Sequence, residues 1–201
     1  MDASEHAQTS VKRGETAEPT LPKLLRAFME TVTPDRVYNE FSLQHELGIY
    51  LRAKLPDFQT EFERNVSRFF DSKYPFVKRE IDIVSYSESL RALRSAVELK
   101  FPRNGQVPET MFSFCKDIAF IEQLKQQGFD STALVILVDD AAFYKGGTNG
   151  IYGYFRAGHP LHGTIQKPTG KRDDQVHIQG TYDVQWKHLA HGLSCSIVIA
   201  Q

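Results

Sequence analysis

The sequence has few cysteines and no long apolar run. Its 201 residues include two cysteines, Cys115 and Cys195, without the spacing of a metal site. One falls in a helical pattern and the other in a strand-like run, so we expect both to be small buried hydrophobic residues. No apolar stretch approaches the ~20 residues of a membrane-spanning helix, and the first residues do not resemble a signal peptide. These absences predict a cytoplasmic protein without a membrane span.

A surplus of basic residues is also missing. Lysine and arginine total 24 against 25 aspartate and glutamate residues, which gives a formal net charge of −1. Because nucleic-acid-binding domains usually carry a basic surplus, any such surface here must be a local patch. A metal-dependent nuclease also keeps acidic residues at its centre, so near-neutrality does not exclude that class. The length and the 41% of hydrophobic residues suit one domain with a sizeable core.

The apolar pattern predicts a mixed α/β fold. Residues 1–20 are polar and nearly free of large apolar side chains, which predicts a disordered leader. We expect residues 21–201 to form a single domain, with a core over about 35–139 and an extension over about 140–201. The predicted elements of the core are two helices, three strands, a helix and a strand, over 22–32, 35–55, 58–69, 77–86, 94–101, 108–127 and 133–138. Further strands are expected near 164–166, 176–186 and 194–200. This order favours a mixed sheet sandwiched by helices, with extra C-terminal strands.

An acidic residue lies on the apolar side of the second predicted helix. Thr33-Pro34-Asp35 is a credible start for this helix. Its predicted buried stripe consists of Val37, Phe41, Leu47, Leu51 and Leu55. Glu40 and Gln44 fall on the same stripe, and a buried carboxylate is costly unless something pairs with it. Either Glu40 reaches solvent at the edge of the stripe, or it faces a site.

Asp82, Glu98 and Lys100 are the residues that suggest chemistry. Each acid lies on a predicted strand, on the face opposite that strand's main apolar row. Glu98 and Lys100 are two positions apart, so both project from one face, about 7 Å from each other. The short polar link over 87–93 predicts an antiparallel hairpin, which lets Asp82 share that face. Glu40 could reach the same point from the helix.

Carboxylates gathered in this way would repel one another. One of them would be protonated unless a cation were present, and a hard divalent ion with oxygen ligands, Mg²⁺ or Mn²⁺, resolves the repulsion. Such an ion can polarise a phosphodiester and lower the pKa of a bound water. Lys100 could then position or deprotonate that water, or neutralise developing charge. The alternative is a solvated sheet face on which acids and lysines simply alternate.

Two segments resemble the D…(D/E)-x-K signature of the PD-(D/E)XK nuclease superfamily. They are Ile81–Val84, which contains the aspartate, and Glu98–Lys100. Ile81 stands where the family name has proline, a replacement common in the superfamily. Glu40–Leu47 is similar to the first-helix E-x-x-L-x-x-x-L pattern of many members. The resemblance spans about Asp35 to Asp139 and implies a restriction-endonuclease-like fold, whose core is a helix, three strands, a helix and a strand.

The resemblance also implies roles. Asp82, Glu98 and Lys100 would be catalytic, with Asp82, Glu98 and the auxiliary Glu40 as metal ligands for Mg²⁺ or Mn²⁺. The implied function is hydrolysis of phosphodiester bonds, with DNA as the expected substrate. A non-catalytic module that binds nucleic acid or protein on the same fold is the alternative. A homodimer would suit a double-strand cut, although nothing in the sequence requires one.

Other charged residues could surround such a site. Glu63, on a neighbouring predicted strand, is expected to pair with Arg64 or Arg79 rather than to take part in catalysis. The basic residues that could contact a phosphate backbone are Arg103, Lys145, Lys167, Lys171 and Arg172. Solvated loops would explain the same basic residues without any nucleic acid.

Overall fold

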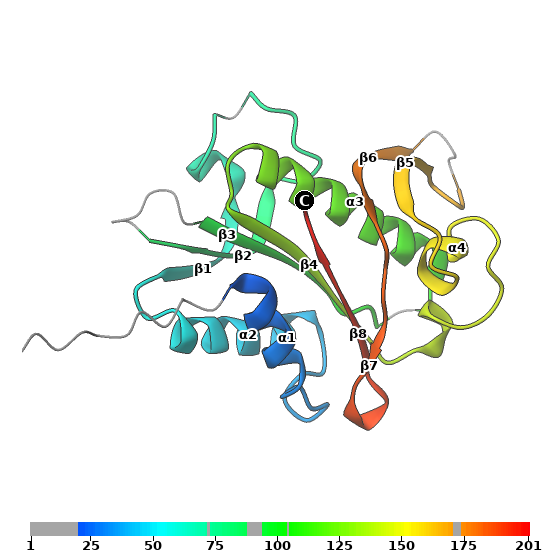
Figure 1. Ribbon diagram of the computed structural model, residues 1–201, viewed down its shortest axis with the longest axis horizontal. Helices are drawn as coiled ribbons and strands as arrows, with labels where there is room; N and C mark the ends of the chain where they lie inside the picture. The colour runs from blue at the N-terminus through cyan, green and yellow to red at the C-terminus, as the bar shows by residue number, and fades with distance from the viewer. Residues whose placement is uncertain (1–19, 72, 88–93, 104, 171–173) are drawn as a thin grey trace, which may run out of the picture.

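The computed structural model describes residues 20–201, except 72, 88–93, 104 and 171–173 (Figure 1). The predicted leader up to residue 19, most of the hairpin link, Lys171 and Arg172 lie outside the described residues. Among the described helices, none combines the length and apolar character needed to cross a membrane.

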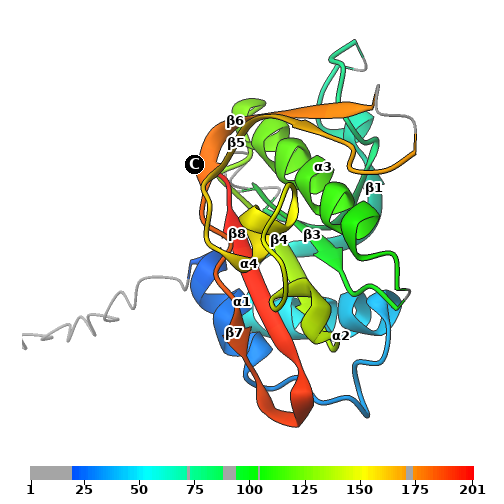
Figure 2. The same cartoon turned by 90° about the vertical axis from the view of Figure 1, so that its right-hand side faces the viewer.

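A six-stranded mixed sheet forms the centre of the molecule, in the order β1-β2-β3-β4-β8-β7. Its strands are β1 (Gln59–Asn65), β2 (Glu80–Tyr86), β3 (Arg94–Lys100), β4 (Ser131–Val138), β7 (Lys187–His188) and β8 (Ser194–Ile199). Its neighbours run antiparallel, except for the parallel pair β3 and β4, which α3 (Val107–Gln126) connects. Helices α1 (Leu21–Met29) and α2 (Glu40–Lys54) cover one face, and α3 covers the other (Figures 1 and 2). The predicted mixed α/β class, with helices on both faces of the sheet, is confirmed.

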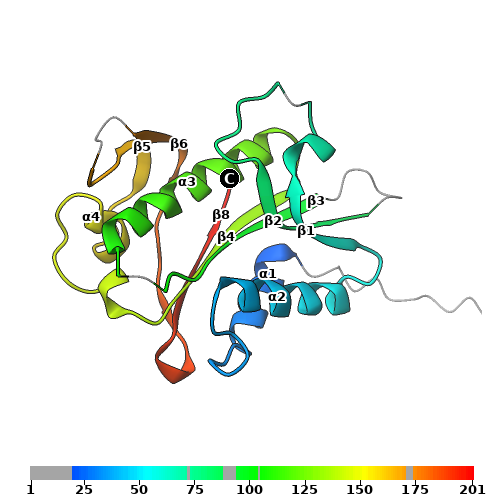
Figure 3. The same ribbon diagram turned by 180° about the vertical axis from the view of Figure 1, so that it is seen from behind.

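The C-terminal third adds a second, two-stranded sheet. Strands β5 (Leu161–Gln166) and β6 (Gln175–Tyr182) pair with each other beside α3, on the same side of the main sheet (Figure 3). The buried Glu122 of α3 accepts hydrogen bonds from the Gly180 N–H (2.6 Å) and the Tyr182 hydroxyl (2.9 Å). These bonds fix β6 to α3. The aromatic segment before β5 forms a short helix, α4 (Tyr152–Arg156).

Strand β4 passes through the middle of the core. Its residues from Thr132 to Val138 are all buried, as its continuous apolar sequence predicts for a strand covered on both faces. Ala133, Val135 and Leu137 face the layer of α1 and α2, whereas the alternate side chains face α3. Cys115 and Cys195 are both buried, which confirms their predicted place in the core.

Helix α2 begins five residues later than the sequence predicts. Asn39 caps it: its side chain accepts a hydrogen bond from the Ser42 N–H (2.8 Å), and the Ser42 hydroxyl accepts one from the Asn39 N–H (2.9 Å). This capping box satisfies the free N–H groups of the first turn, so the start at Thr33-Pro34-Asp35 is wrong. The buried row runs through Leu43, Leu47 and Leu51. Phe41, predicted to be buried, is 77% exposed, and Glu40 lies in the first turn rather than on the buried stripe.

Strands β1 and β2 are shorter than predicted. β1 ends at Asn65, where the backbone enters the 3-10 helix η1 (Val66–Arg68), and β2 begins at Glu80 instead of Val77. Two further 3-10 helices, η2 (Ala141–Phe143) and η3 (Ala190–Gly192), follow β4 and β7. Val66 packs into the core from irregular backbone, whereas Val77 is 43% exposed, and sequence periodicity does not distinguish either from a strand residue.

Candidate active site

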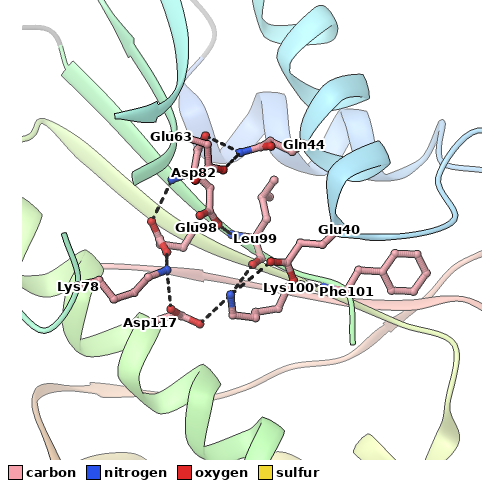
Figure 4. Close-up of polar contacts among 10 residues, drawn as sticks. All are labelled: Glu40, Gln44, Glu63, Lys78, Asp82, Glu98, Leu99, Lys100, Phe101 and Asp117. Carbon is pink, nitrogen blue, oxygen red and sulfur yellow. Dashed lines mark hydrogen bonds and ion pairs between the residues drawn. The ribbon is translucent and has the colours of Figure 1, made fainter. Parts of the chain in front are cut away.

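The candidate site lies where β2 and β3 separate. The two strands pair from Tyr86 opposite Arg94 as far as Ile83 opposite Val97. Beyond that point, side chains take over the hydrogen bonding (Figure 4). The Leu99 N–H donates to Asp82 Oδ2 (2.7 Å), and the Asp82 N–H donates to Glu98 Oε1 (3.3 Å). The two carboxylates therefore satisfy backbone groups that a continued ladder would have paired.

The predicted antiparallel hairpin is confirmed by this pairing. Asp82 and Glu98 come together as the hairpin requires, and the geometry also explains why they are buried. A carboxylate that accepts backbone N–H bonds inside a sheet has to lie between the strands. Loss of either side chain would leave a main-chain N–H without its acceptor, which costs about 1–3 kcal/mol.

Glu40 reaches the end of β3 from the first turn of α2. Its Oε2 accepts a hydrogen bond from the Phe101 N–H (3.0 Å), and its Oε1 lies 3.6 Å from Lys100 Nζ. The sequence prediction that Glu40 approaches the other acids is therefore met, although through the helix N-terminus rather than a buried stripe. The structure brings Glu40 and Lys100 into one ion pair.

Glu98 and Lys100 face α3. Glu98 has no exposed surface and forms a short ion pair with Lys78, from the segment that precedes β2. Lys78 Nζ also lies 3.1 Å from Oδ1 of Asp117 on α3, and Lys100 Nζ lies 3.4 Å from Asp117 Oδ2. Asp117 is thus buried between two lysines, and the charges alternate through the cluster (Figure 4).

Lys78 and Asp117 are site residues that the sequence reasoning missed. Asp117 carried a usable signal, because it lies three positions after Phe114 in a helix that is largely buried. An acid in that position needs a partner, by the argument applied to Glu40. Lys78 carried no such signal, since it lies in irregular backbone four positions before Asp82.

A small pocket opens on the other side of the same cluster. Its volume is about 50 Å³, more than the ~10–15 Å³ that a cavity needs to hold one water molecule. The residues that line it are Glu40, Phe41, Gln44, Glu63, Asp82 and Leu99. The Gln44 amide donates to the Asp82 main-chain oxygen (2.8 Å) and to the Glu63 carboxylate. The pocket is therefore an acidic recess beside the N-terminus of α2.

Glu63 belongs to this pocket, contrary to the expectation from the sequence. Arg64 pairs with Glu61 instead, with Arg64 Nε 2.6 Å from Glu61 Oε2. Glu63 lies between Phe62 and Arg64, whose partners in β2 flank Asp82, and its φ of 50° is unusual for a residue other than glycine. This local backbone conformation accompanies a carboxylate that lines the recess, a feature that alternation along the strand does not predict.

Burial controls the protonation of these groups. It raises the pKa of Asp82 to about 6, against the opposing effect of the Lys78 charge and the Leu99 N–H. Burial also raises the pKa of Glu98, and the negative charge of Asp82 adds to that rise, whereas Lys78 opposes it. Burial by itself would lower the pKa of both lysines, but Glu98 and Asp117 raise that of Lys78, and Asp117 and Glu40 raise that of Lys100. Both lysines therefore remain ammonium groups.

The described cluster has more carboxylates than ammonium groups. The five acids are Glu40, Glu63, Asp82, Glu98 and Asp117, and the two bases are Lys78 and Lys100. When all are ionised, the acids exceed the bases by three charges, and the acids that line the recess carry this excess. A cation bound in the recess would remove much of the resulting repulsion.

The donor set fits a hard divalent ion in part. Within the described residues, no group of three or more His, Cys, Asp or Glu side chains is arranged to hold a metal ion. Mg²⁺, however, usually takes one or two carboxylates, several waters and substrate phosphate oxygens, so it needs no complete protein cage. Asp82 together with Glu40 or Glu63 offers such a set. Glu98, also an expected ligand, has its Oε2 in the ion pair with Lys78, and its role as a ligand stays a prediction.

Three of the predicted phosphate-contacting residues lie within the described part of the chain. Arg103 follows β3 and pairs with Asp139, Lys145 is exposed after η2 with its Nζ 5.7 Å from the centroid of the Tyr144 ring, and Lys167 follows β5. Each belongs to a different segment, and a joint role in nucleic-acid binding stays a prediction. No family model, curated protein or solved structure matches the chain.

Proposed function

We propose that the protein is a metal-dependent nuclease of the PD-(D/E)XK type that hydrolyses phosphodiester bonds, with DNA as its substrate. The observation that carries this proposal is the placement of Asp82, Glu98 and Lys100 where β2 and β3 separate, with Glu40 reaching the same point from α2. Four residues from three elements converge there. A solvated sheet face would not bury Glu98 completely or leave the pKa of Asp82 raised.

The arrangement of the elements supports the same proposal. Helix α2, strands β1 to β3, helix α3 and strand β4 follow in the order that the superfamily resemblance implies. The hairpin β2–β3 and the parallel crossover to β4 place the acidic residues at one end of the central strands. A restriction-endonuclease-like fold is therefore part of the proposal, and β5 to β8 are additions to its core.

The residues that line the recess, together with Lys100, have specific tasks in this proposal. Asp82, with Glu40 or Glu63, would hold a Mg²⁺ or Mn²⁺ ion. When bound, this ion would polarise the phosphodiester and lower the pKa of a water ligand. Lys100, an ammonium group at the end of β3, would orient the attacking water or offset negative charge on phosphorus. The exposed ring of Phe41 at the recess offers a surface on which a base can stack.

A second candidate is a module that binds nucleic acid or protein without turnover. The observation that favours it is the ion pair between Glu98 and Lys78. This pair occupies Oε2 of Glu98, a residue that a nuclease of this type would use as a metal ligand. In that case the charged cluster would hold the sheet to α3 and would have no catalytic task.

A cleavage assay distinguishes the two candidates. Supercoiled plasmid, labelled single-stranded DNA and labelled RNA would be incubated with Mg²⁺, Mn²⁺ or EDTA, using the wild-type protein and Asp82→Asn. Asparagine retains an acceptor for the Leu99 N–H, so this variant removes the charge with less damage to the sheet than alanine. Metal-dependent cleavage that disappears in Asp82→Asn supports the nuclease. Intact substrates under every condition would reject it in favour of the binding module.

A further inference from the structure

A half-buried lysine, Lys78, occupies the side of Glu98 that faces α3. The Lys78 ammonium contacts Glu98 Oε2 and lies 3.1 Å from Asp117 Oδ1, with its Nζ 5.6 Å from the centroid of the Phe120 ring. Glu98 is fully buried, and Asp117 is 2% exposed. Two carboxylates without access to water therefore depend on this ammonium group.

One carboxylate oxygen of Asp117 is buried without a hydrogen bond. Its Oδ2 is buried and lacks a hydrogen-bond donor among the described residues, although Lys100 Nζ lies 3.4 Å away. A buried carboxylate oxygen without a hydrogen bond has to be compensated by nearby positive charge. Removal of Lys78 would leave Lys100 as the cation within ion-pair distance of Asp117, and Glu98 would lose its own.

Both carboxylate oxygens of Glu98 are bound by groups of this protein. Oε1 accepts the hydrogen bond from the Asp82 N–H, and Oε2 receives the Lys78 ammonium. Glu98 therefore fixes the backbone at Asp82, while the Asp82 side chain lines the recess together with Glu40 and Glu63. The cation on one side of the cluster belongs to the chain, and the excess negative charge is on the other side.

We propose that Lys78 is a built-in cation that takes the place of a second divalent ion beside Glu98, so that the site accepts a single ion, in the recess of Glu40, Glu63 and Asp82. An ammonium group and a divalent ion compete for the same carboxylate oxygens. The part that concerns the ion in the recess rests on the proposed nuclease function, whereas the part that concerns Lys78 and Glu98 does not. Lys78 is thus a positioning residue, which acts through Glu98.

The test counts the bound ions. Mn²⁺ would be titrated by calorimetry into the wild-type protein, Lys78→Met and Lys78→Arg, and thermal unfolding would be followed in EDTA and in Mn²⁺. The matched control is Lys116→Met, because Lys116 is a partly exposed lysine of α3 whose Nζ lies 2.9 Å from Asp174 Oδ2. We expect Lys78→Met to bind one more Mn²⁺ than the wild type. Its midpoint temperature should fall in EDTA and rise more steeply with Mn²⁺, whereas Lys78→Arg and Lys116→Met should bind as many ions as the wild type.

Several results would overturn the inference. One is an unchanged ion count and an unchanged Mn²⁺ response in Lys78→Met, and another is a variant that stays unfolded both with and without Mn²⁺. The double variant Lys78→Met with Glu98→Gln removes both charges, so a gained ion that persists there would show that Glu98 is not its ligand. If the wild type binds no ion and Lys78→Met binds one, the proposed metal in the recess fails while the assignment of Lys78 stands.

Discussion

The charged cluster has two halves that differ in how their charge is compensated. The α3 half, defined by Lys78, Glu98, Lys100 and Asp117, is largely buried and contains as many lysines as acids. The α2 half, defined by Glu40, Glu63 and Asp82, lines an open recess and is entirely acidic. The charges of Glu98 and Asp117 have to be balanced by the chain itself, because these two carboxylates are almost completely removed from water. Charge at an open recess can be balanced by an ion from solution, and this difference is what suggests a binding site on the α2 side.

We expect the largest effect on stability from removing Lys78, whose charge compensates the buried acids of the α3 half. Lys78→Ala leaves the buried Glu98 without its cation and the buried Asp117 with Lys100 alone, and breaking a buried pair in this way costs about 3–5 kcal/mol. We expect the free energy of unfolding, measured by urea titration in EDTA, to fall by roughly that amount. Lys116→Ala serves as the control, since loss of a partly exposed pair costs about 1 kcal/mol or less. Equal losses in the two variants would show that burial does not distinguish the pairs.

The next effect concerns Lys100, which joins the two halves. Lys100→Met keeps the length of the side chain and leaves Asp117 in contact with Lys78. If the proposed function holds, the cleavage rate should fall at least about 100-fold, the lower range for loss of such a catalytic group. The thermal midpoint should change less than in Lys78→Ala. A cleavage rate near that of the wild type would remove Lys100 from the chemistry.

A smaller effect should appear as a pH dependence of stability in the α2 half. The folded-state pKa of Asp82 is about 6, above the value of ~3.9 in an unfolded chain. As the pH falls through 6 toward 4, the folded state therefore takes up a proton that the unfolded state does not, and Asp82 contributes greater stability at the lower pH. In EDTA, the wild type should gain roughly 2 kcal/mol relative to Asp82→Asn between pH 7 and pH 4.5. The comparison of the two urea titrations cancels the groups that do not interact with Asp82, and identical pH profiles would contradict the raised pKa.

The smallest effect should be seen at the rim of the recess. Phe41→Ala removes an exposed ring and should leave the fold unchanged, while it weakens the binding of single-stranded DNA about tenfold, near the lower limit for loss of one stacked base. Fluorescence anisotropy with Ca²⁺ in place of Mg²⁺ would measure this binding. Ile49→Ala is the control, because Ile49 is exposed on the same helix but does not line the recess. Similar affinities in both variants would exclude a stacking role for Phe41.

Local patterns in the sequence were sufficient to predict the hairpin of β2 and β3. Alternation with a period of two placed Glu98 and Lys100 on one face, and the short link after Tyr86 placed Asp82 opposite them. Both are short-range features, in which each residue's orientation follows from its neighbours. The same applies to β4, whose continuous apolar sequence indicates a strand covered on both sides.

Contacts between residues that are distant in the sequence could not be predicted from local patterns. The partner of Lys78, Asp117, lies on α3, which follows the hairpin in the sequence. No pattern near Lys78 predicts this ion pair. Phe41 was misplaced because the predicted stripe included Val37, which precedes the helix, whereas the buried row of the helix runs through Leu43, Leu47 and Leu51. The recess adds Glu63 through a positive φ, a conformation that depends on the tertiary contacts of the strand.

Strand β8 has a consequence for the route by which the chain folds. It pairs with β4 along its whole length, from Ala133 opposite Ile199 to Val138 opposite Ser194, yet α4, β5 and β6 separate the two in the sequence. Helix α1 packs on the same region of the sheet, with its side chains in one apolar cluster with Cys195. Contacts between such distant segments are slow to form, because a long loop has to close before they contribute. Until β8 is in place, one edge of β4 stays unpaired, and an unpaired strand edge can pair with another chain.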